Sequence, residues 1–219
     1  MASRNTVKVA VRVRPLNDGQ TPCISTIPES NQVCAGVGEN PTAFTYDHTF
    51  DSNSTQASVY DECVLDLVNS AFDGFNATIL AYGQTGSGKT WTMGSGSSAD
   101  LHMDGELVGI IPRVIQSLFI IVKDREALEP MSTYKIHVQF LELYGEDIKD
   151  LLDATKTSKV VIRELTTGEV VVSGAREELV TSYEEMMKTL EVGSKQRTTA
   201  KTKMNDLSSR SHAIFTVRI

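Results

Sequence analysis

The sequence has few of the features that mark secreted, metal-binding or membrane proteins. Its 219 residues include only three cysteines, Cys23, Cys34 and Cys63, which show no Cys-x-x-Cys spacing and no neighbouring histidine cluster. Scattered cysteines in odd number favour neither a disulfide framework nor a zinc site, so we interpret them as reduced thiols. No hydrophobic run approaches the ~18 residues that span a bilayer, and the N-terminus lacks a signal-peptide core. We therefore expect a soluble, intracellular protein with no membrane partner.

Positive charge is also scarce. The chain has 21 Lys and Arg against 28 Asp and Glu, which gives a formal net charge of -7. This balance argues against a general nucleic-acid coat, and we expect no direct nucleic-acid binding by this segment. The composition is otherwise globular, with 40% hydrophobic and 22% charged residues. Because no internal repeat, low-complexity tract or linker is visible, the sequence predicts a single α/β domain.

Hydrophobic periodicity predicts an alternation of strands and helices. The predicted strands are residues 7–13, 44–50, 77–82, 134–144 and 213–219, with a small hairpin formed by 160–162 and 170–172. The predicted helices start at Ser54 or Thr55 and end at Gly74, run through 108–122 with Pro112 in the first turn, and run from Ser182 to Gly193. The 77–82 run is almost continuously apolar, which is typical of a strand buried in a parallel sheet covered on both faces.

A glycine-rich loop follows that run directly. Residues 83–90 fit the pattern Gly-x-x-x-x-Gly-Lys-[Ser/Thr] and are, in order, Gly83, Gln84, Thr85, Gly86, Ser87, Gly88, Lys89 and Thr90. Glycines let successive backbone N–H groups turn toward phosphate oxygens, the lysine reaches the β- and γ-phosphates, and the threonine hydroxyl ligates Mg²⁺. The alternative is a flexible loop with an incidental lysine. The apolar run before the loop and the helical pattern after it favour nucleotide binding.

A second polar string lies far downstream. A guanine-reading Asn-Lys-x-Asp is absent, because residues 202–205 fail at the last position, while a small-molecule kinase would keep the same phosphate loop. Residues 205–212 offer an amide, two hydroxyls and a guanidinium, namely Asn205, Ser208, Ser209 and Arg210. Alone, such a string is more often a solvated turn. Paired with the phosphate loop, it favours a γ-phosphate sensor.

Four strings in this order resemble the kinesin motor domain, and the resemblance covers essentially the whole chain. They are residues 12–15, 82–90, 141–144 with 147–152 close behind, and 205–212. A myosin would share a phosphate loop and a Ser-Ser-Arg string, but kinesins continue with Ser-His, as Ser211 and His212 do here. Residues 44–51 and 145–148 resemble the kinesin-4, or chromokinesin, branch.

The resemblance implies a P-loop NTPase fold, α/β, with a central, mostly parallel sheet flanked by helices. It implies roles for single residues as well. Arg12, Arg14 and Pro15 would border the adenine, and the Trp91 ring would lie against the base; a tryptophan buried behind the helix is the alternative. Asn205, Ser208 and Ser209 would form the first nucleotide switch, with Ser209 near Mg²⁺ and Ser208 near the attacking water. Arg210 would pair with a glutamate of a second switch. The residues expected to act in catalysis are thus Lys89, Asn205, Ser208, Ser209 and Arg210, and the metal-holding ones are Thr90 and Ser209.

The family's second switch, Asp-x-x-Gly-x-Glu, would follow the strand near Ile219. We therefore interpret residues 1–219 as a motor domain that lacks this switch and the main microtubule-binding elements. The implied function is that of the N-terminal part of an ATP-hydrolysing microtubule motor in the cytoplasm and cytoskeleton, with ATP or ADP and Mg²⁺ as ligands and microtubules as the partner of the full-length protein. The motifs carry no information on oligomeric state.

Two other interpretations stay open at this point. One is a nucleotide-binding interaction module without turnover. The other is a phosphotransferase acting on a small molecule, with Glu142 as a Walker B carboxylate. For Glu142 itself, we favour a polar residue on an exposed strand face.

Overall fold

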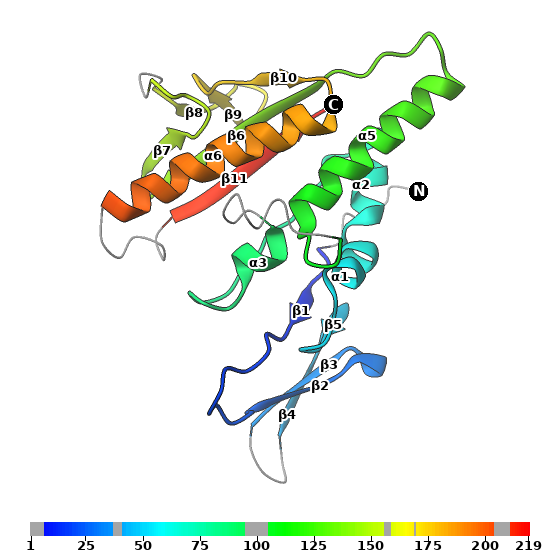
Figure 1. Ribbon diagram of the computed structural model, residues 1–219, viewed down its shortest axis with the longest axis vertical. Coiled ribbons are helices and arrows are strands. Elements are labelled where there is room, and N and C mark those ends of the chain that lie inside the picture. Colours follow the sequence, from blue (N-terminus) through cyan, green and yellow to red (C-terminus); the bar gives the residue numbers. More distant parts are fainter. Residues whose placement is uncertain (1–6, 37–40, 95–104, 156–158, 169, 204–210) are drawn as a thin grey trace.

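The computed structural model describes residues 7–36, 41–94, 105–155, 159–168, 170–203 and 211–219. One part of the molecule is a sheet with the long helix α6 lying along it, and the other is a set of short strands next to α1 and α3 (Figure 1). The helices are α1 (Gln56–Cys63), α2 (Leu65–Phe72), α3 (Lys89–Met93), α5 (Ile110–Leu128), α6 (Tyr183–Lys203) and the 3-10 turn η1 (Pro28–Ser30). The strands are β1 (Ala10–Arg12), β2 (Ile24–Ile27), β3 (Gln32–Ala35), β4 (Thr42–Thr45), β5 (His48–Phe50), β6 (Ile136–Tyr144), β7 (Asp147–Asp150), β8 (Val161–Glu164), β9 (Val170–Ser173), β10 (Glu178–Val180) and β11 (Ser211–Arg218).

The hydrophobic core joins the helices to the main sheet. Side chains from α1, α2 and α5 pack with those of β6 and α6, and the most deeply buried are Val64, Ile115, Val138, Phe140, Met186 and Leu190. Among the described residues, none of the helices combines the length and the apolar character that crossing a bilayer requires.

Strand β6 is the centre of the largest sheet. Strand β11 pairs with it antiparallel from Arg218 opposite His137 to Ser211 opposite Tyr144. Because β11 takes one edge over this length, β10 and β7 share the other edge, at the beginning and the end of β6 respectively. All these pairs are antiparallel, and β1 with β5 is the parallel pair among the described strands. The expected strands at 134–144 and 213–219 are therefore present, as 136–144 and 211–218, and the pairing among the described strands is mixed, with β1 and β5 parallel and the other pairs antiparallel.

Helix α6 packs on β6 with almost no space between them. A Cβ atom on Gly193 would lie 2.2 Å from Cδ1 of Phe140, so glycine at this position lets the helix approach the aromatic ring. We predicted that this helix ends at Gly193, and this was wrong because the helix continues to Lys203. The glycine is there for close packing and not as a terminator. Its cost in helix propensity, about 1 kcal/mol, is offset by the packing around it.

Local capping fixes where two helices begin. The Thr55 side chain accepts a hydrogen bond from the backbone N–H of Ser58 and caps α1, and Gly74 follows α2 with a φ of +88°, both as expected. The single helix predicted between these two residues is instead two helices, interrupted at Val64. The Ser182 hydroxyl accepts from the N–H of Glu185 at 3.2 Å at the start of α6. The reciprocal bond of a capping box is displaced, because the Glu185 carboxylate accepts from Thr181 instead. The resulting bonds lower the pKa of Glu185.

The apolar segment 77–82 is not a strand, contrary to the prediction. It runs as irregular chain into the phosphate loop, and Leu80 and Tyr82 are 84% and 95% exposed. The physical reason is that a strand needs hydrogen-bonding neighbours, and no described strand pairs with this segment. Composition alone therefore gave the wrong environment for these side chains.

Two glycines bring α3 and α5 into backbone contact. A Cβ on Gly109 would lie 2.3 Å from the backbone N of Gly94, and one on Gly94 would lie 2.8 Å from the Gly109 Cα. Gly94 also has a φ of +70°, which a side chain disfavours. Pro112 lies in the first turn of α5, as predicted. The helix that follows the phosphate loop is therefore held against the start of α5.

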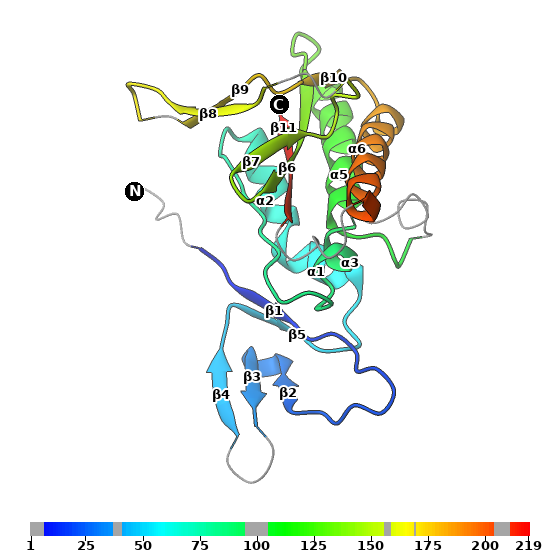
Figure 2. The same cartoon turned by 90° about the vertical axis from the view of Figure 1, so that its left-hand side faces the viewer.

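The predicted hairpin is present as β8 and β9, which pair antiparallel from Val161 opposite Ser173 to Glu164 opposite Val170. Figure 2 shows it projecting away from α5 and α6. The stretch expected as one strand at 44–50 is instead two, β4 and β5, interrupted at Tyr46 and Asp47.

Candidate nucleotide-binding site

The phosphate loop has a backbone that only glycine adopts readily. Gly83, Gly86 and Gly88 have φ angles of +151°, +81° and +97°. A Cβ on Gly83 would also lie 2.6 Å from the Ser87 hydroxyl oxygen, so the loop curls too tightly for a side chain there. Lys89 and Thr90 are then the first residues of α3. The glycine spacing in the sequence thus corresponds to a curled turn that enters a helix.

The Lys89 side chain lies across this curl. Its ammonium donates to the carbonyl oxygens of Gly83 and Gln84 at 2.6 and 2.8 Å. Thr90, the next residue, is exposed to solvent. Both carbonyls belong to the first two residues of the loop, so the ammonium is held against the start of the loop.

Arg14 reaches the same loop from the end of β1. Its Nη1 donates to the carbonyl oxygen of Gly86. Its Cδ and Cγ atoms lie 3.9 and 4.0 Å from where a Cβ on Gly88 would be, which is van der Waals contact. Pro15 follows and is exposed. The structure thus brings Arg14 onto the phosphate loop itself, while the resemblance expects it beside the adenine.

Arg12 lies at a junction of three segments. Its Nη1 donates to Gln56 Oε1 at 2.7 Å and to the Thr92 hydroxyl at 3.1 Å, and its Nη2 donates to the carbonyl oxygen of Ser54 at 3.1 Å. We call Arg12, Ser54, Gln56 and Thr92 the Arg12 junction. Burial lowers the pKa of the Arg12 guanidinium, and these acceptors replace the water that burial removes.

Sequence reasoning missed Gln56. It is only 3% exposed, and its Nε2 donates to the carbonyl oxygens of Trp91 at 2.7 Å and Leu107 at 3.5 Å. A glutamine after an N-cap threonine is ordinary in a first helical turn, so nothing local in the sequence marks it. Its partners are 35 to 51 residues away along the chain.

Trp91, the single tryptophan, is 44% exposed. Its backbone carbonyl is bound to Gln56, and its side chain is not part of the buried core. The alternative of a tryptophan buried behind the helix is therefore not what the structure has.

The downstream switch residues Asn205, Ser208, Ser209 and Arg210 lie outside the described residues. Ser211 is the first residue of β11, and its hydroxyl donates to Glu142 Oε1. Arg197 of α6 lies 3.4 Å from the same carboxylate oxygen. Glu142 is 4% exposed, so our interpretation of it as a residue on an exposed strand face was wrong.

Glu142 is buried because side chains that face each other recur at nearly the same spacing along α6 and along β6. Four residues along a helix advance about 6 Å, and two residues along a strand advance about 7 Å. Since Gly193 lies on Phe140, Arg197 comes to lie on Glu142. Glu142 pairs with Ala213 of β11 on one side and Lys149 of β7 on the other, so it lies on an inner strand of the sheet. Its carboxylate also contacts Ser211 at the start of β11.

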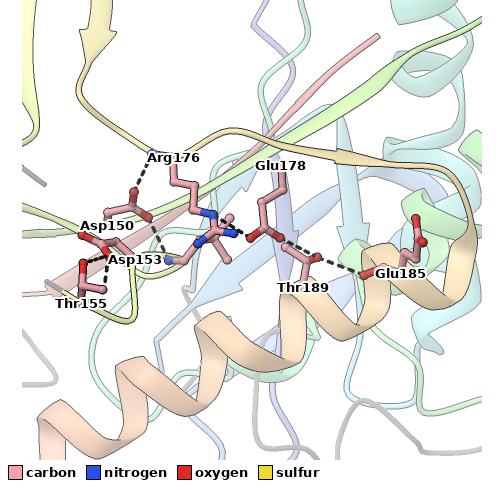
Figure 3. A network of polar contacts seen from close by, with 8 residues as sticks. Asp150, Asp153, Thr155, Arg176, Glu178, Glu185 and Thr189 are labelled. Atoms are coloured by element: carbon pink, nitrogen blue, oxygen red, sulfur yellow. Dashed lines mark hydrogen bonds and ion pairs between the residues drawn. The ribbon is translucent and has the colours of Figure 1, made fainter.

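A separate polar network fixes β10 to α6 away from the phosphate loop (Figure 3). The Asp150 carboxylate accepts from the backbone N–H groups of Leu152 and Arg176 at 2.8 and 2.6 Å. Arg176 Nε lies 3.0 Å from Glu178 Oε1, and the Thr189 hydroxyl lies 3.3 Å from Glu178 Oε2. This network joins the segment that follows the β8–β9 hairpin to β7 and α6.

The described residues fit a nucleotide phosphate chain. The observation is the loop itself: a turn that a Cβ on Gly83 would fill, with an ammonium held across it. The donor set consists of an ammonium and a hydroxyl, which bind phosphate and a hard cation such as Mg²⁺.

Comparison with known proteins agrees with this geometry. The family model described as "Kinesin motor domain" matches residues 12–219. The chain is 43% identical to Kinesin-like protein KIF27 of Mus musculus over 220 residues, 97% of this chain and 15% of that protein. It is 40% identical to Kinesin-like protein KIN-4A of Gossypium hirsutum over 236 residues, 97% of this chain and 22% of that protein. A solved structure, "Structure of a fast kinesin: Implications for ATPase mechanism and interactions with microtubules", aligns with a TM-score of 0.83 and 31% identity, over 97% of this chain and 59% of that one.

The glycine loop, the lysine across it and the helix after it define the chain as a P-loop nucleotide-binding protein of α/β class. More narrowly, the chain belongs to the kinesin motor domain family, as the match over residues 12–219 establishes. It spans about 15% of the length of the mouse relative.

Proposed function

We propose that this chain binds ATP and ADP with Mg²⁺ and hydrolyses ATP as the N-terminal part of a microtubule motor domain. The observation that carries the proposal is the Lys89 ammonium held across the curl of residues 83–88. In this geometry the backbone N–H groups of the loop and the lysine surround the phosphates of a nucleotide.

The residues would divide the work as follows. Lys89 exchanges its carbonyl partners for oxygens of the β- and γ-phosphates, and Arg14 holds the loop at Gly86. Thr90 and Ser209 would hold Mg²⁺, which neutralises charge between the β- and γ-phosphates when bound. Ser208 would orient the attacking water, Asn205 would contact the γ-phosphate, and Arg210 would lock the switch by an ion pair. Catalysis of this kind rests on position and electrostatics.

The base would lie between Arg12 and Pro15 on one side and the Trp91 ring on the other. Trp91 is exposed on the first turn of α3, directly after the phosphate loop, so its indole is accessible to a ligand. An indole stacked on adenine would add about 1 kcal/mol beyond area burial, by analogy with aromatic pairs in proteins.

For the whole protein we propose microtubules as partner and the cytoplasm and cytoskeleton as location. The solved kinesin carries ATPase and microtubule interactions in its description, which supports this assignment. The KIN-4A relative supports the kinesin-4 branch. A nucleotide-binding module without turnover is not favoured, since the mouse and cotton relatives are kinesin-like proteins.

Isothermal titration calorimetry with ADP and Mg²⁺ tests the phosphate assignment. Lys89→Ala should lower ADP affinity by about 10- to 100-fold, because a charged donor to phosphate is lost. Lys123→Ala removes the same charge from an exposed position of α5 and should bind like the wild type. Equal affinities of wild type and Lys89→Ala would refute the assignment. Phosphate release with ATP, measured with and without microtubules, then separates a motor ATPase from a module without turnover.

A further inference from the structure

Gln56 occupies the centre of the Arg12 junction, and none of the motifs in the sequence includes it. It comes from the first turn of α1, and its amide uses both ends. The oxygen accepts from Arg12 at 2.7 Å, and the nitrogen donates to the Trp91 carbonyl at 2.7 Å. A single side chain thus connects β1 to the helix that leaves the phosphate loop.

The burial of Gln56 makes these bonds obligatory. At 3% exposure, the amide has no access to bulk water, and an unpaired buried amide is costly. An amide is also the one neutral side-chain group of this length that can accept from a guanidinium and donate to a carbonyl. Glutamate would keep the acceptor but oppose the Trp91 carbonyl, and methionine would keep the volume without either bond.

The Arg12 guanidinium is correspondingly fixed. Three of its five N–H groups are committed to Gln56, Thr92 and the Ser54 carbonyl, so the plane of the group is set from two segments, residues 54–56 and α3. Thr92 and Trp91 both belong to α3. Arg12 and Gln56, which are hydrogen-bonded to each other, therefore both hold the same helix. Removing the Gln56 amide takes one acceptor from Arg12 Nη1, which keeps Thr92, and one donor from the Trp91 carbonyl, which keeps the Gly94 N–H.

We propose that Gln56 is a positioning residue for the purine end of the nucleotide site, acting through Arg12 and the Trp91 backbone. This inference rests on the proposed nucleotide binding. The phosphate loop has separate support, because its own glycines, Lys89 and the bond from Arg14 to Gly86 set its shape. Gln56 therefore governs recognition of the base and leaves recognition of the phosphates largely untouched.

Paired titrations of the full chain with Mg²⁺–ADP and with Mg²⁺–pyrophosphate, a ligand without a base, test this proposal. Gln56→Met should lower ADP affinity about tenfold, the effect of one or two lost buried hydrogen bonds, and change pyrophosphate affinity less than about twofold. Gln56→Glu keeps side-chain length and the acceptor for Arg12; it serves if the methionine variant does not fold, and should lower ADP affinity about threefold.

Thr189→Val is the matched control. Thr189 is also buried and hydrogen-bonded, but it lies in the network of Figure 3. The Thr189→Val variant should have a lower thermal stability and an unchanged ratio of ADP to pyrophosphate affinity, because a smaller folded fraction lowers both apparent affinities equally. Adding Arg12→Ala to Gln56→Met should cost less ADP affinity than adding it to the wild type, since Gln56 acts through Arg12.

The outcomes separate cleanly. A fall in ADP affinity alone, coupled to Arg12, supports the positioning role. Equal losses for ADP and pyrophosphate, or no coupling to Arg12, overturn it while leaving nucleotide binding intact. If wild type and Lys89→Ala bind ADP equally, the proposed function itself fails and this role falls with it.

Discussion

The buried pair of Glu142 and Arg197 makes a quantitative prediction for folding. Their side chains are 5% and 14% exposed, and Arg197 Nε lies 3.4 Å from Glu142 Oε1. Removing one partner of a buried ion pair costs about 3–5 kcal/mol, because the other charge stays buried without compensation. The 3.4 Å separation and the 14% exposure of Arg197 place the loss at or below the bottom of this range. We expect Glu142→Leu to lower the free energy of unfolding by about 2–3 kcal/mol.

Urea unfolding followed by far-UV circular dichroism measures this loss, and the thermal midpoint should fall by about 5–10 °C for a chain of this size. The matched control is Asp73→Asn, which breaks the exposed pair with Arg125 at 2.9 Å and should change stability little. The double variant Glu142→Leu, Arg197→Met should regain most of the loss, since no charge then remains buried.

Two results would refute this reasoning. One is a Glu142→Leu variant as stable as Asp73→Asn, which would place Glu142 in contact with water. The other is strict additivity of the two single substitutions, which would mean that the side chains do not interact.

Three further predictions concern other sites. ADP should change the fluorescence of Trp91 and protect it from acrylamide, because no other tryptophan contributes; an unchanged spectrum and unchanged quenching would contradict stacking on the base. Gly193→Ala should lower the urea midpoint strongly, since its Cβ would lie 2.2 Å from a Phe140 ring atom and must move α6 or the ring; wild-type stability would show that α6 does not lie this close. Burial raises the pKa of Cys63 to about 11, so at pH 8 it stays a neutral thiol and should react with iodoacetamide far more slowly than exposed Cys23, its rate rising with pH up to about 11; mass spectrometry of labelled peptides distinguishes the two, and equal rates would contradict the burial.

Local features of the site could be predicted from the sequence because they depend on neighbours along the chain. The glycine spacing of residues 83–90 dictates the positive φ angles and places Lys89 at the helix start. The Thr55 cap and the β8–β9 hairpin are local in the same sense. Each depends on side chains a few residues apart, so a pattern is enough to find it.

Features that depend on distant partners could not be predicted. Gln56 gains its importance from Arg12, 44 residues before it, and Trp91, 35 residues after it. Glu142 is buried because α6 continues beyond Gly193 and covers it. Helix propensity alone predicts that the helix ends at this glycine. The run at 77–82 shows the opposite error, because apolar composition predicts a covered strand and hydrogen-bonding neighbours decide whether one forms. Roles expected for Asn205, Ser208, Ser209 and Arg210 remain predictions.

The contact between Gly94 and Gly109 has a consequence for how this region can change in evolution or by engineering. The chain leaves α3 and enters α5 at two points whose backbones already touch. Any peptide between them closes a loop on a fixed base, and the entropy of closing it grows only with the logarithm of its length, by about 0.6 kcal/mol for each doubling. Insertions between these glycines are therefore inexpensive for the fold. An affinity tag or a fluorescent reporter peptide inserted between Gly94 and Gly105 would leave the two helix ends in contact and keep the bonds that residues 105–108 make to Arg113 and Gln56.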